Sequence, residues 1–200
     1  MDVTPEMLVE LECRFAPVVA TSPAVFSPRE RIRKDAENAG GDKMASDRNG
    51  YAGFYAEVLS GLRPARIVEV GVFQGSSLAM WCDLFPDAEV VGLDLDFVRY
   101  GRNLPFLRDA GAFARCAPRL VEWDAYSEAA PDVGGAVDLF VDDGPHTERA
   151  IKNALRIFGP MMSDGGVYVV EDYAGAGGLL SEAFPDGRVV SSGRIAAARL

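Results

Sequence analysis

The sequence is poor in the residues that build zinc sites and disulfide frameworks. It has one histidine and three cysteines among 200 residues. Cys13, Cys82 and Cys116 are widely spaced and form no C-x-x-C pair, so we expect reduced thiols that serve mainly in packing. The chain also lacks an apolar run of membrane-spanning length and a basic, apolar leader at its start. These absences predict a cytoplasmic protein that is not embedded in a membrane.

Positive charge is also scarce. Lysine and arginine together number 20, against 30 aspartates and glutamates, which gives a formal net charge of −10. Nucleic acids and anionic membranes carry the same sign of charge, so neither is an expected partner. The apolar fraction of 48% and the length are those of a single globular domain that buries a substantial core.

Residues 1–64 differ in character from the rest of the chain. Thr4 and Pro5 predict the start of a helix over "TPEMLVELECRF", and "YAGFYAEVLSGL" (51–62) predicts a second, short helix. Between them, residues 29–50 are charged and end in a glycine-containing stretch without an apolar face, which favours a mobile surface segment. We expect residues 1–64 to cap the cleft or to form an oligomer contact, within one structural domain overall.

From residue 66 onward, short apolar strands alternate with helices. The expected strands are 66–70, 89–96, 119–123, 136–143 and 166–173, and the expected helices are 76–85 and 146–162. Such alternation predicts a parallel sheet with helices on both faces, and residues 65–200 form this core. The end of the chain reads as an antiparallel hairpin, with "RVVS" and "RIAAARL" on either side of a Ser192-Gly193 turn.

A glycine loop follows the first of these strands, in "IVEVGVFQGSSLAMW". Gly71 and Gly75 would let a ligand approach the backbone, and the helix that opens at Ser76 offers free N–H groups. Phe73 stands where a dinucleotide fingerprint needs glycine, so pyrophosphate recognition is disfavoured. Asp94 ends the next strand, where an acid commonly accepts hydrogen bonds from ribose hydroxyls. These features favour a nucleoside ligand; a tight turn with glycines needed only for packing is the alternative.

"EVGVFQGSSL" followed by "VVGLDLD" resembles motifs I and II of the class I S-adenosylmethionine-dependent methyltransferases. The resemblance implies an α/β Rossmann-like fold, with a seven-stranded, mostly parallel sheet that ends in an antiparallel hairpin. It also implies that Glu69, Gly71 and Gly75 border the methionine part of S-adenosylmethionine and that Asp94 holds its ribose. Asp124, in "VEWDAYS", falls where the family has a residue near the adenine.

Acidic residues gather at the ends of two strands expected to be parallel neighbours. Asp142 and Asp143 end one strand, and Glu171 and Asp172 end the other. Carboxylates that converge repel one another unless a cation neutralises them, and oxygen ligands suit Mg²⁺ or Ca²⁺ better than Zn²⁺. We assign Asp142 to the cofactor side of this edge. Solvated acids with no ion are the alternative.

The single histidine, His146, lies three residues beyond the acid pair. Thr147 is a plausible cap of the next helix, so His146 lies just outside that helix, at the ligand edge. An imidazole can accept and release a proton near neutral pH, which makes it a candidate general base. The alternative is a histidine that simply donates a hydrogen bond to a nearby carbonyl.

"DLFVDDGPHTERAIKNALRIFGPMMSDGGVYVVEDY" resembles the metal-dependent sugar O-methyltransferases of macrolide tailoring, of the macrocin and mycinamicin type, and the related cephalosporin-hydroxylase and rhamnosyl O-methyltransferase group. "GGDKMASDRNGYAGFYAEVL" is similar to their Asp-Lys segment and tyrosine-rich helix. The resemblance implies Mg²⁺ on Asp143, Glu171 and Asp172, with Asp143 and His146 as catalytic residues. Pro145 departs from the serine usual in these proteins.

The sequence therefore predicts a methyltransferase that acts on a hydroxyl of a small molecule. The resemblance implies an acceptor such as the sugar of a glycosylated natural product in antibiotic tailoring, and a homodimer is the default expectation. One alternative is a non-catalytic cofactor-binding or scaffold subunit. Another is an NAD-dependent oxidoreductase, which Phe73 disfavours.

Overall fold

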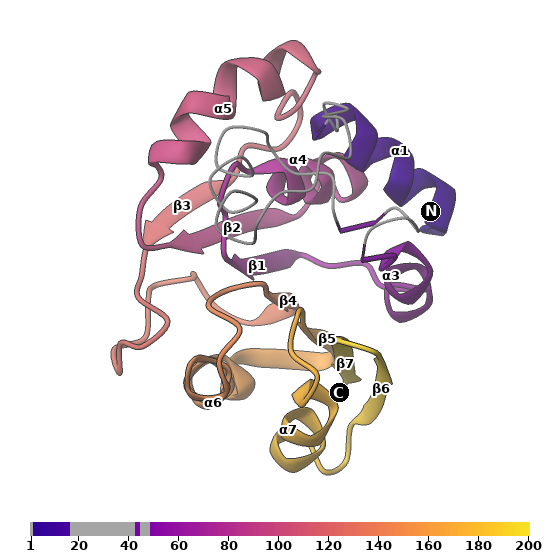
Figure 1. Cartoon of the computed structure of the whole chain (residues 1–200), viewed down its shortest axis with the longest axis vertical. Coiled ribbons are helices and arrows are strands. Elements are labelled where there is room, and N and C mark those ends of the chain that lie inside the picture. Colours follow the sequence, from indigo (N-terminus) through magenta and orange to yellow (C-terminus); the bar gives the residue numbers. More distant parts are fainter. Residues whose placement is uncertain (1, 17–42, 45–48) are drawn as a thin grey trace, which may run out of the picture.

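The computed structural model describes residues 2–16, 43–44 and 49–200 (Figure 1). Its centre is a seven-stranded sheet in the order β3-β2-β1-β4-β5-β7-β6. Strands β1 to β5 are parallel, and β7 runs antiparallel to both β5 and β6. The strands are β1 (Arg66–Val70), β2 (Glu89–Asp94), β3 (Arg119–Glu122), β4 (Val137–Asp142), β5 (Met162–Val170), β6 (Arg188–Ser192) and β7 (Ile195–Arg199). The predicted Rossmann-like sheet with a C-terminal hairpin is confirmed.

Helices cover both faces of the sheet (Figure 1). One face carries α1 (Pro5–Phe15), α3 (Ala52–Val58), α4 (Ser76–Leu84) and α5 (Val98–Asp109), and the other carries α6 (Glu148–Phe158) and α7 (Ala176–Ala183). The strands are buried on both faces, which is why they read as nearly continuous apolar runs. In the described part of the chain, no helix is both long and apolar enough to cross a membrane.

Aromatic side chains fill the core on each face. On the α4 face, the rings of Tyr55 and Trp81 pack with centroids 5.5 Å apart. On the α6 face, Phe140 lies between Phe158 and Tyr168, with both centroid separations at 4.5 Å. The first pair joins α3 to α4, and the second set joins α6 to β4 and β5.

The first helix forms where the sequence predicts it. Thr4 is its N-cap, with Oγ1 accepting a hydrogen bond from the amide of Met7 at 3.3 Å, and Pro5 occupies the first helical position. Glu12 is buried in α1 and accepts hydrogen bonds from the backbone amides of Lys43 and Met44. This contact fixes Lys43 and Met44 next to the core.

The structure differs from the sequence prediction in three helices. The helix expected over 146–162 ends at Phe158; a short 3₁₀ turn (Gly159–Met161) follows, and β5 begins earlier than expected, at Met162. The sequence pattern predicted neither α5 nor α7. Pro105 lies inside α5, and two glycines lie inside α7, so local propensity obscured both helices. Most of the charged segment 29–50 lies outside the described residues.

Candidate functional site

The carboxyl ends of β1, β4 and β5 meet at one edge of the sheet. Val70 pairs with Asp142 across β1 and β4, and Asp142 pairs with Val170 across β4 and β5. The residues that follow these strands are therefore spatial neighbours, which is the position where open α/β sheets bind their ligands.

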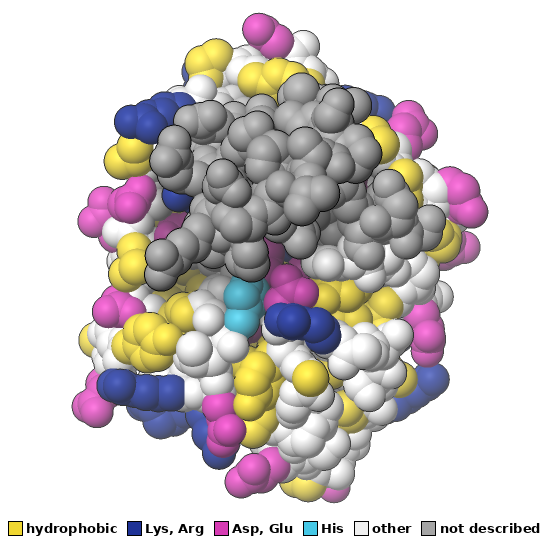
Figure 2. All heavy atoms as spheres, in the orientation of Figure 1, with side chains coloured by type: hydrophobic (Ala, Val, Ile, Leu, Met, Phe, Trp, Pro, Cys, Tyr) yellow, Lys and Arg dark blue, Asp and Glu magenta, His cyan; other side chains and the backbone are white. Residues whose placement is uncertain are grey.

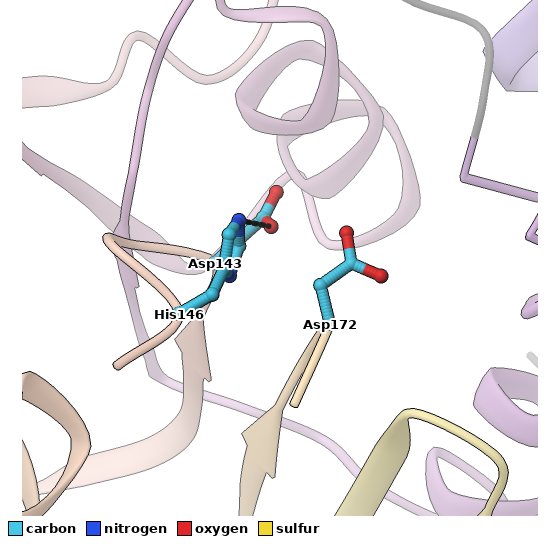
Figure 3. Close-up of side chains that lie close together, drawn as sticks. All are labelled: Asp143, His146 and Asp172. Carbon is cyan, nitrogen blue, oxygen red and sulfur yellow. Dashed lines mark ion pairs between the residues drawn. The ribbon is translucent and has the colours of Figure 1, made fainter. Parts of the chain in front are cut away.

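Two carboxylates and the imidazole come together at this edge. One ligand atom from each of Asp143, His146 and Asp172 lies within 4.8 Å of the others (Figure 3). Nε2 of His146 is 3.9 Å from Oδ1 of Asp143. The three side chains remain 23%, 37% and 27% exposed for Asp143, His146 and Asp172, and Figure 2 shows the imidazole at the surface beside acidic side chains. Two carboxylates with room for further oxygen ligands fit a hard divalent cation.

The backbone at two of these residues is in a conformation that side chains seldom adopt. Among the described residues, four that are not glycine have a positive φ, and these include His146 at 53° and Asp172 at 54°. Phe73, in the loop after β1, is a third, at 49°. Such conformations cost free energy and tend to occur at functional sites, because surrounding contacts must hold them.

A buried lysine adjoins this group from the other side of Asp143. Nζ of Lys43 is 3.0 Å from Oδ2 of Asp143, 3.0 Å from Oε1 of Glu171 and 3.6 Å from Oε1 of Glu69. The hydroxyl of Tyr55 donates a hydrogen bond to Oε1 of Glu171. Asp143 thus faces Lys43 with one oxygen and His146 with the other, and it joins the two groups.

Burial perturbs the ionisation of this inner cluster. It raises the pKa of Glu69 to about 7 and that of Glu171 to about 8, because desolvation disfavours the charged carboxylate more than Lys43 favours it. Burial alone would lower the pKa of Lys43, but Asp143, Glu171 and Glu69 together raise it well above its ordinary value. These carboxyl groups therefore favour the charged form of Lys43.

The predicted metal ligands divide between these two groups. Asp143 and Asp172 lie in the exposed group with His146, whereas Glu171 contacts Lys43 and Tyr55. The role of Glu171 as a metal ligand stays a prediction. The hydroxyl of Tyr51 donates to Oδ1 of Asp172 at 2.6 Å, and burial together with that hydrogen bond raises the pKa of the tyrosine.

Sequence reasoning assigned no role to Lys43, Tyr51 or Tyr55, although all three reach the site. Their signal was present in the Asp-Lys segment and tyrosine-rich helix that precede the glycine loop. They precede the first strand by up to 23 positions, and only α1 and α3 packing onto the sheet brings them to the acids.

Asp142 is the last residue of β4, and Asp143 follows the strand. The side chain of Asp142 is buried, and Oδ1 accepts a hydrogen bond from the amide of Gly144 at 3.3 Å. Within the described residues, Oδ2 of Asp142 has no hydrogen-bond partner. Burial raises the pKa of this carboxyl to about 7, and the neighbouring Asp143 adds to the effect. Its assignment to the cofactor stays a prediction.

The glycine loop is closely packed against the acid pair. A Cβ on Gly71 would lie 2.1 Å from the backbone oxygen of Asp143, and one on Gly75 would lie 2.4 Å from the ring of Tyr100. Both glycines also have positive φ values, of 92° and 81°. Oδ2 of Asp94 accepts the amides of Val72 at 2.9 Å and Phe73 at 3.0 Å, so this acid holds the loop in shape.

Gly71→Ala is expected to destabilise the protein much more than Gly61→Ala. Both glycines have positive φ, but a Cβ on Gly61 would meet no atom within 4 Å. We expect a loss of roughly 2–4 kcal/mol for Gly71→Ala and about 1 kcal/mol for the control. Urea unfolding followed by circular dichroism measures both. Equal losses would show that the contact with Asp143 does not require glycine.

The other predicted cofactor residues lie at the same edge with different contacts. Oγ of Ser76 donates to the backbone oxygen of Phe15 at 3.2 Å and so ties α4 to α1. Glu69 is fully buried in β1 and accepts a hydrogen bond from Oγ of Ser77 at 2.9 Å. Asp124 is exposed and accepts the amide of Tyr126 at 2.8 Å in a turn after β3. Their roles toward S-adenosylmethionine stay predictions.

Residues 68–173 match the methyltransferase domain family, and this range spans β1 to the end of the acid cluster. The chain belongs to the methyltransferase domain family. It is similar to the macrocin and mycinamicin type of sugar O-methyltransferase within class I.

The domain is 29% identical over 150 residues to an 8-demethyl-8-(2-methoxy-alpha-L-rhamnosyl)-tetracenomycin-C 3'-O-methyltransferase of Streptomyces olivaceus, covering 65% of this chain and 35% of the relative. It is 28% identical over 120 residues to a mycinamicin VI 2''-O-methyltransferase of Micromonospora griseorubida, covering 54% and 27%. The chain therefore spans about a third of the length of the curated relatives it matches.

Solved structures confirm the fold. MycE methyltransferase from the mycinamycin biosynthetic pathway, in complex with Mg and SAH, superposes with a TM-score of 0.59 at 17% identity. The superposition covers 88% of this chain and 55% of MycE. At this identity, the similarity supports the architecture of the methyltransferase domain. It does not assign roles to individual residues of this chain.

Proposed function

We propose that the protein is an S-adenosylmethionine-dependent, divalent-metal-dependent O-methyltransferase that acts on a hydroxyl of a small molecule. The observation that carries this proposal is the exposed group of Asp143, His146 and Asp172. It lies at the carboxyl edge of a methyltransferase sheet, and Gly71 of the glycine loop packs against the backbone of Asp143. The proposed metal ligands, the proposed base and the glycine loop therefore lie at one edge of the sheet.

The types of residue suggest a division of roles. Mg²⁺ prefers oxygen ligands, so Asp143 and Asp172 are the natural ligands in the exposed group, with Glu171 as the third predicted one. The imidazole of His146 is a poorer ligand for such an ion and a better base. Oδ1 of Asp143, 3.9 Å from Nε2, would stabilise the imidazolium that forms when His146 accepts a proton.

When bound, S-adenosylmethionine supplies an electrophilic methyl group, and a divalent ion supplies positive charge that makes a hydroxyl more acidic. The residues of this chain do the rest. Asp143 and Asp172 orient the acceptor hydroxyl, and Nε2 of His146 takes its proton. The glycine loop and Asp94 hold the donor side in place. Alignment of donor and acceptor accounts for much of the expected rate.

The acceptor class is proposed from the relatives. Their names specify O-methylation of a rhamnosyl tetracenomycin, an L-olivosyl oleandolide and mycinamicin VI. We propose a sugar hydroxyl on a glycosylated natural product, with the homodimer and the cytoplasmic location as accompanying proposals. A screen of glycosylated polyketides with labelled S-adenosylmethionine, in the presence of Mg²⁺, tests this acceptor class.

S-adenosylmethionine is expected to raise the melting temperature of the protein, whereas NAD is not. A ligand at 100 times its Kd stabilises the folded state by about 2.7 kcal/mol. For a chain of this length, that corresponds to a shift of roughly 5–10 °C. Thermal unfolding with each ligand measures it, and calorimetric titration with and without Mg²⁺ gives the affinities. A shift with NAD alone would contradict the proposal.

Methyl transfer by the isolated chain separates an enzyme from a scaffold subunit. If S-adenosylmethionine binds but no hydroxylated acceptor is methylated under any metal condition, the non-catalytic alternative gains support. This outcome matters here because the chain covers only about a third of its curated relatives.

A further inference from the structure

Lys43 is a charged group at the site to which the proposed function gives no role. Its ammonium lies among three carboxylates, at 3.0 Å from Asp143, 3.0 Å from Glu171 and 3.6 Å from Glu69. The lysine side chain is 11% exposed, and those of Glu69 and Glu171 are 0% and 1% exposed. A buried charge of this kind is retained only where it is paired, so the contacts define a specific position.

The backbone of Lys43 is held from two sides. Glu12 of α1 accepts the amides of Lys43 and Met44 at 2.9 and 3.0 Å. The carbonyl oxygen of Lys43 accepts the amide of Tyr51 at 3.0 Å, just before α3. Two helices outside the matched family range therefore aim this ammonium at the acids. Specific backbone hydrogen bonds to Glu12 and Tyr51 therefore fix the position of the lysine.

Lys43 is surrounded by carboxyl groups. Its ammonium faces those of Asp143, Glu171 and Glu69, and Asp172, which is 3.9 Å from Arg194, lies just beyond Asp143 in the exposed group. Without the ammonium, the ionised carboxylates of Asp143 and Glu171 would repel each other, and the burial of Glu171 limits screening by water. With it, they are held together in the absence of any other cation. A divalent ion bound to Asp143 would lie close to the same ammonium and would be repelled by it.

We propose that Lys43 is a positioning residue that acts as a fixed internal countercharge. It keeps Asp143 and Glu171 assembled when no metal is bound and weakens the binding of a divalent ion at the exposed oxygens. The inference rests on the metal site of the proposed function. It assigns to α1 and α3 the task of setting the metal affinity, in addition to covering the sheet.

Lys43→Met should therefore change metal binding and metal-free stability in opposite directions. We expect the variant of the full chain to bind Mn²⁺ at least about tenfold more tightly than the unsubstituted protein, because a nearby positive charge is gone. Without metal it should melt at a lower temperature, and Mn²⁺ should restore more of its stability. The free Mn²⁺ signal in electron paramagnetic resonance measures affinity, and thermal unfolding with EDTA measures stability.

Lys152→Met is the matched control. Lys152 is 2.6 Å from Glu148 on an exposed turn of α6, so the same loss of charge occurs away from the acid cluster. It should leave Mn²⁺ affinity within about threefold of the original. Lys43→Arg, which keeps the charge, should bind Mn²⁺ more weakly than Lys43→Met. Lys43→Gln replaces Lys43→Met if the latter does not fold.

The outcomes separate this inference from the proposed function. If Lys43→Met binds Mn²⁺ no more tightly than Lys152→Met does, the countercharge role is overturned. If the unsubstituted protein does not bind Mn²⁺, the metal part of the proposed function fails. The melting temperatures without metal then test the role of Lys43. If the Lys43 and Lys152 substitutions lower the melting temperature equally, that role is overturned.

Discussion

Replacing His146 with Asn is expected to lower methyl-transfer turnover by roughly 10²–10⁴-fold, the usual contribution of a general base. Asn is the informative substitution because residue 146 has a positive φ of 53°, which Asn tolerates better than most residues. The variant loses the basic nitrogen while the turn between β4 and α6 keeps its shape. Ala at this position should lose as much activity and some stability in addition.

Binding measurements decide whether His146 is the base. The Kd for S-adenosylhomocysteine should change by less than about threefold, because His146 lies on the acceptor side of the proposed site. Added imidazole should restore part of the rate to the Asn variant. An equal loss of turnover and of cofactor affinity would instead show that His146 supports the cofactor loop, and its role as base would be wrong.

Replacing Asp143 with Asn should have the second large effect, on the metal requirement. Asp143 faces Lys43 with Oδ2 and His146 with Oδ1, so a neutral amide should weaken both the proposed metal site and the support of the imidazole. Loss of a contact that only orients a ligand already costs 10–100-fold in metal affinity. We therefore expect the Mg²⁺ concentration for half-maximal activity to rise at least about tenfold, with lower turnover at saturation.

Asp132→Asn is a suitable control for that experiment. Asp132 lies at the opposite edge of the sheet, where its backbone oxygen accepts a hydrogen bond from Arg119, the first residue of β3. The substitution removes one negative charge and should leave the Mg²⁺ requirement unchanged. A wild-type rate that survives chelation of divalent ions would contradict the metal dependence itself.

Much of the fold could be predicted because local patterns and tertiary structure agree. The β-branched runs at 66–70 and 137–142 are buried on both faces, and such runs are typical of parallel strands. Thr147 caps α6 as its position predicts, with Oγ1 accepting the amide of Ala150 at 3.3 Å. Helix α5 was missed because Pro105 interrupts its pattern, and only packing against the sheet stabilises it.

The site could be predicted less completely, because its residues come from separate segments of the chain. The rule that parallel strands end at one edge correctly brought Asp143 and Asp172 together. The same rule cannot say which face a terminal side chain takes. Asp142 and Asp143 are consecutive, yet Asp143 joins the exposed group and Asp142 is buried.

The sequence by itself determined the class of fold, the edge of the sheet at which the candidate site lies and the types of residue available there. These follow from periodicity and from the order of strands and loops, which are properties of nearby residues. The tertiary structure alone decided the partners of each acid. The packing of α1 and α3 places Lys43 between Glu69 and Glu171, and this contact crosses more than a hundred residues of sequence to Glu171. Such long-range placement depends on the summed packing of the whole core, which no local pattern encodes.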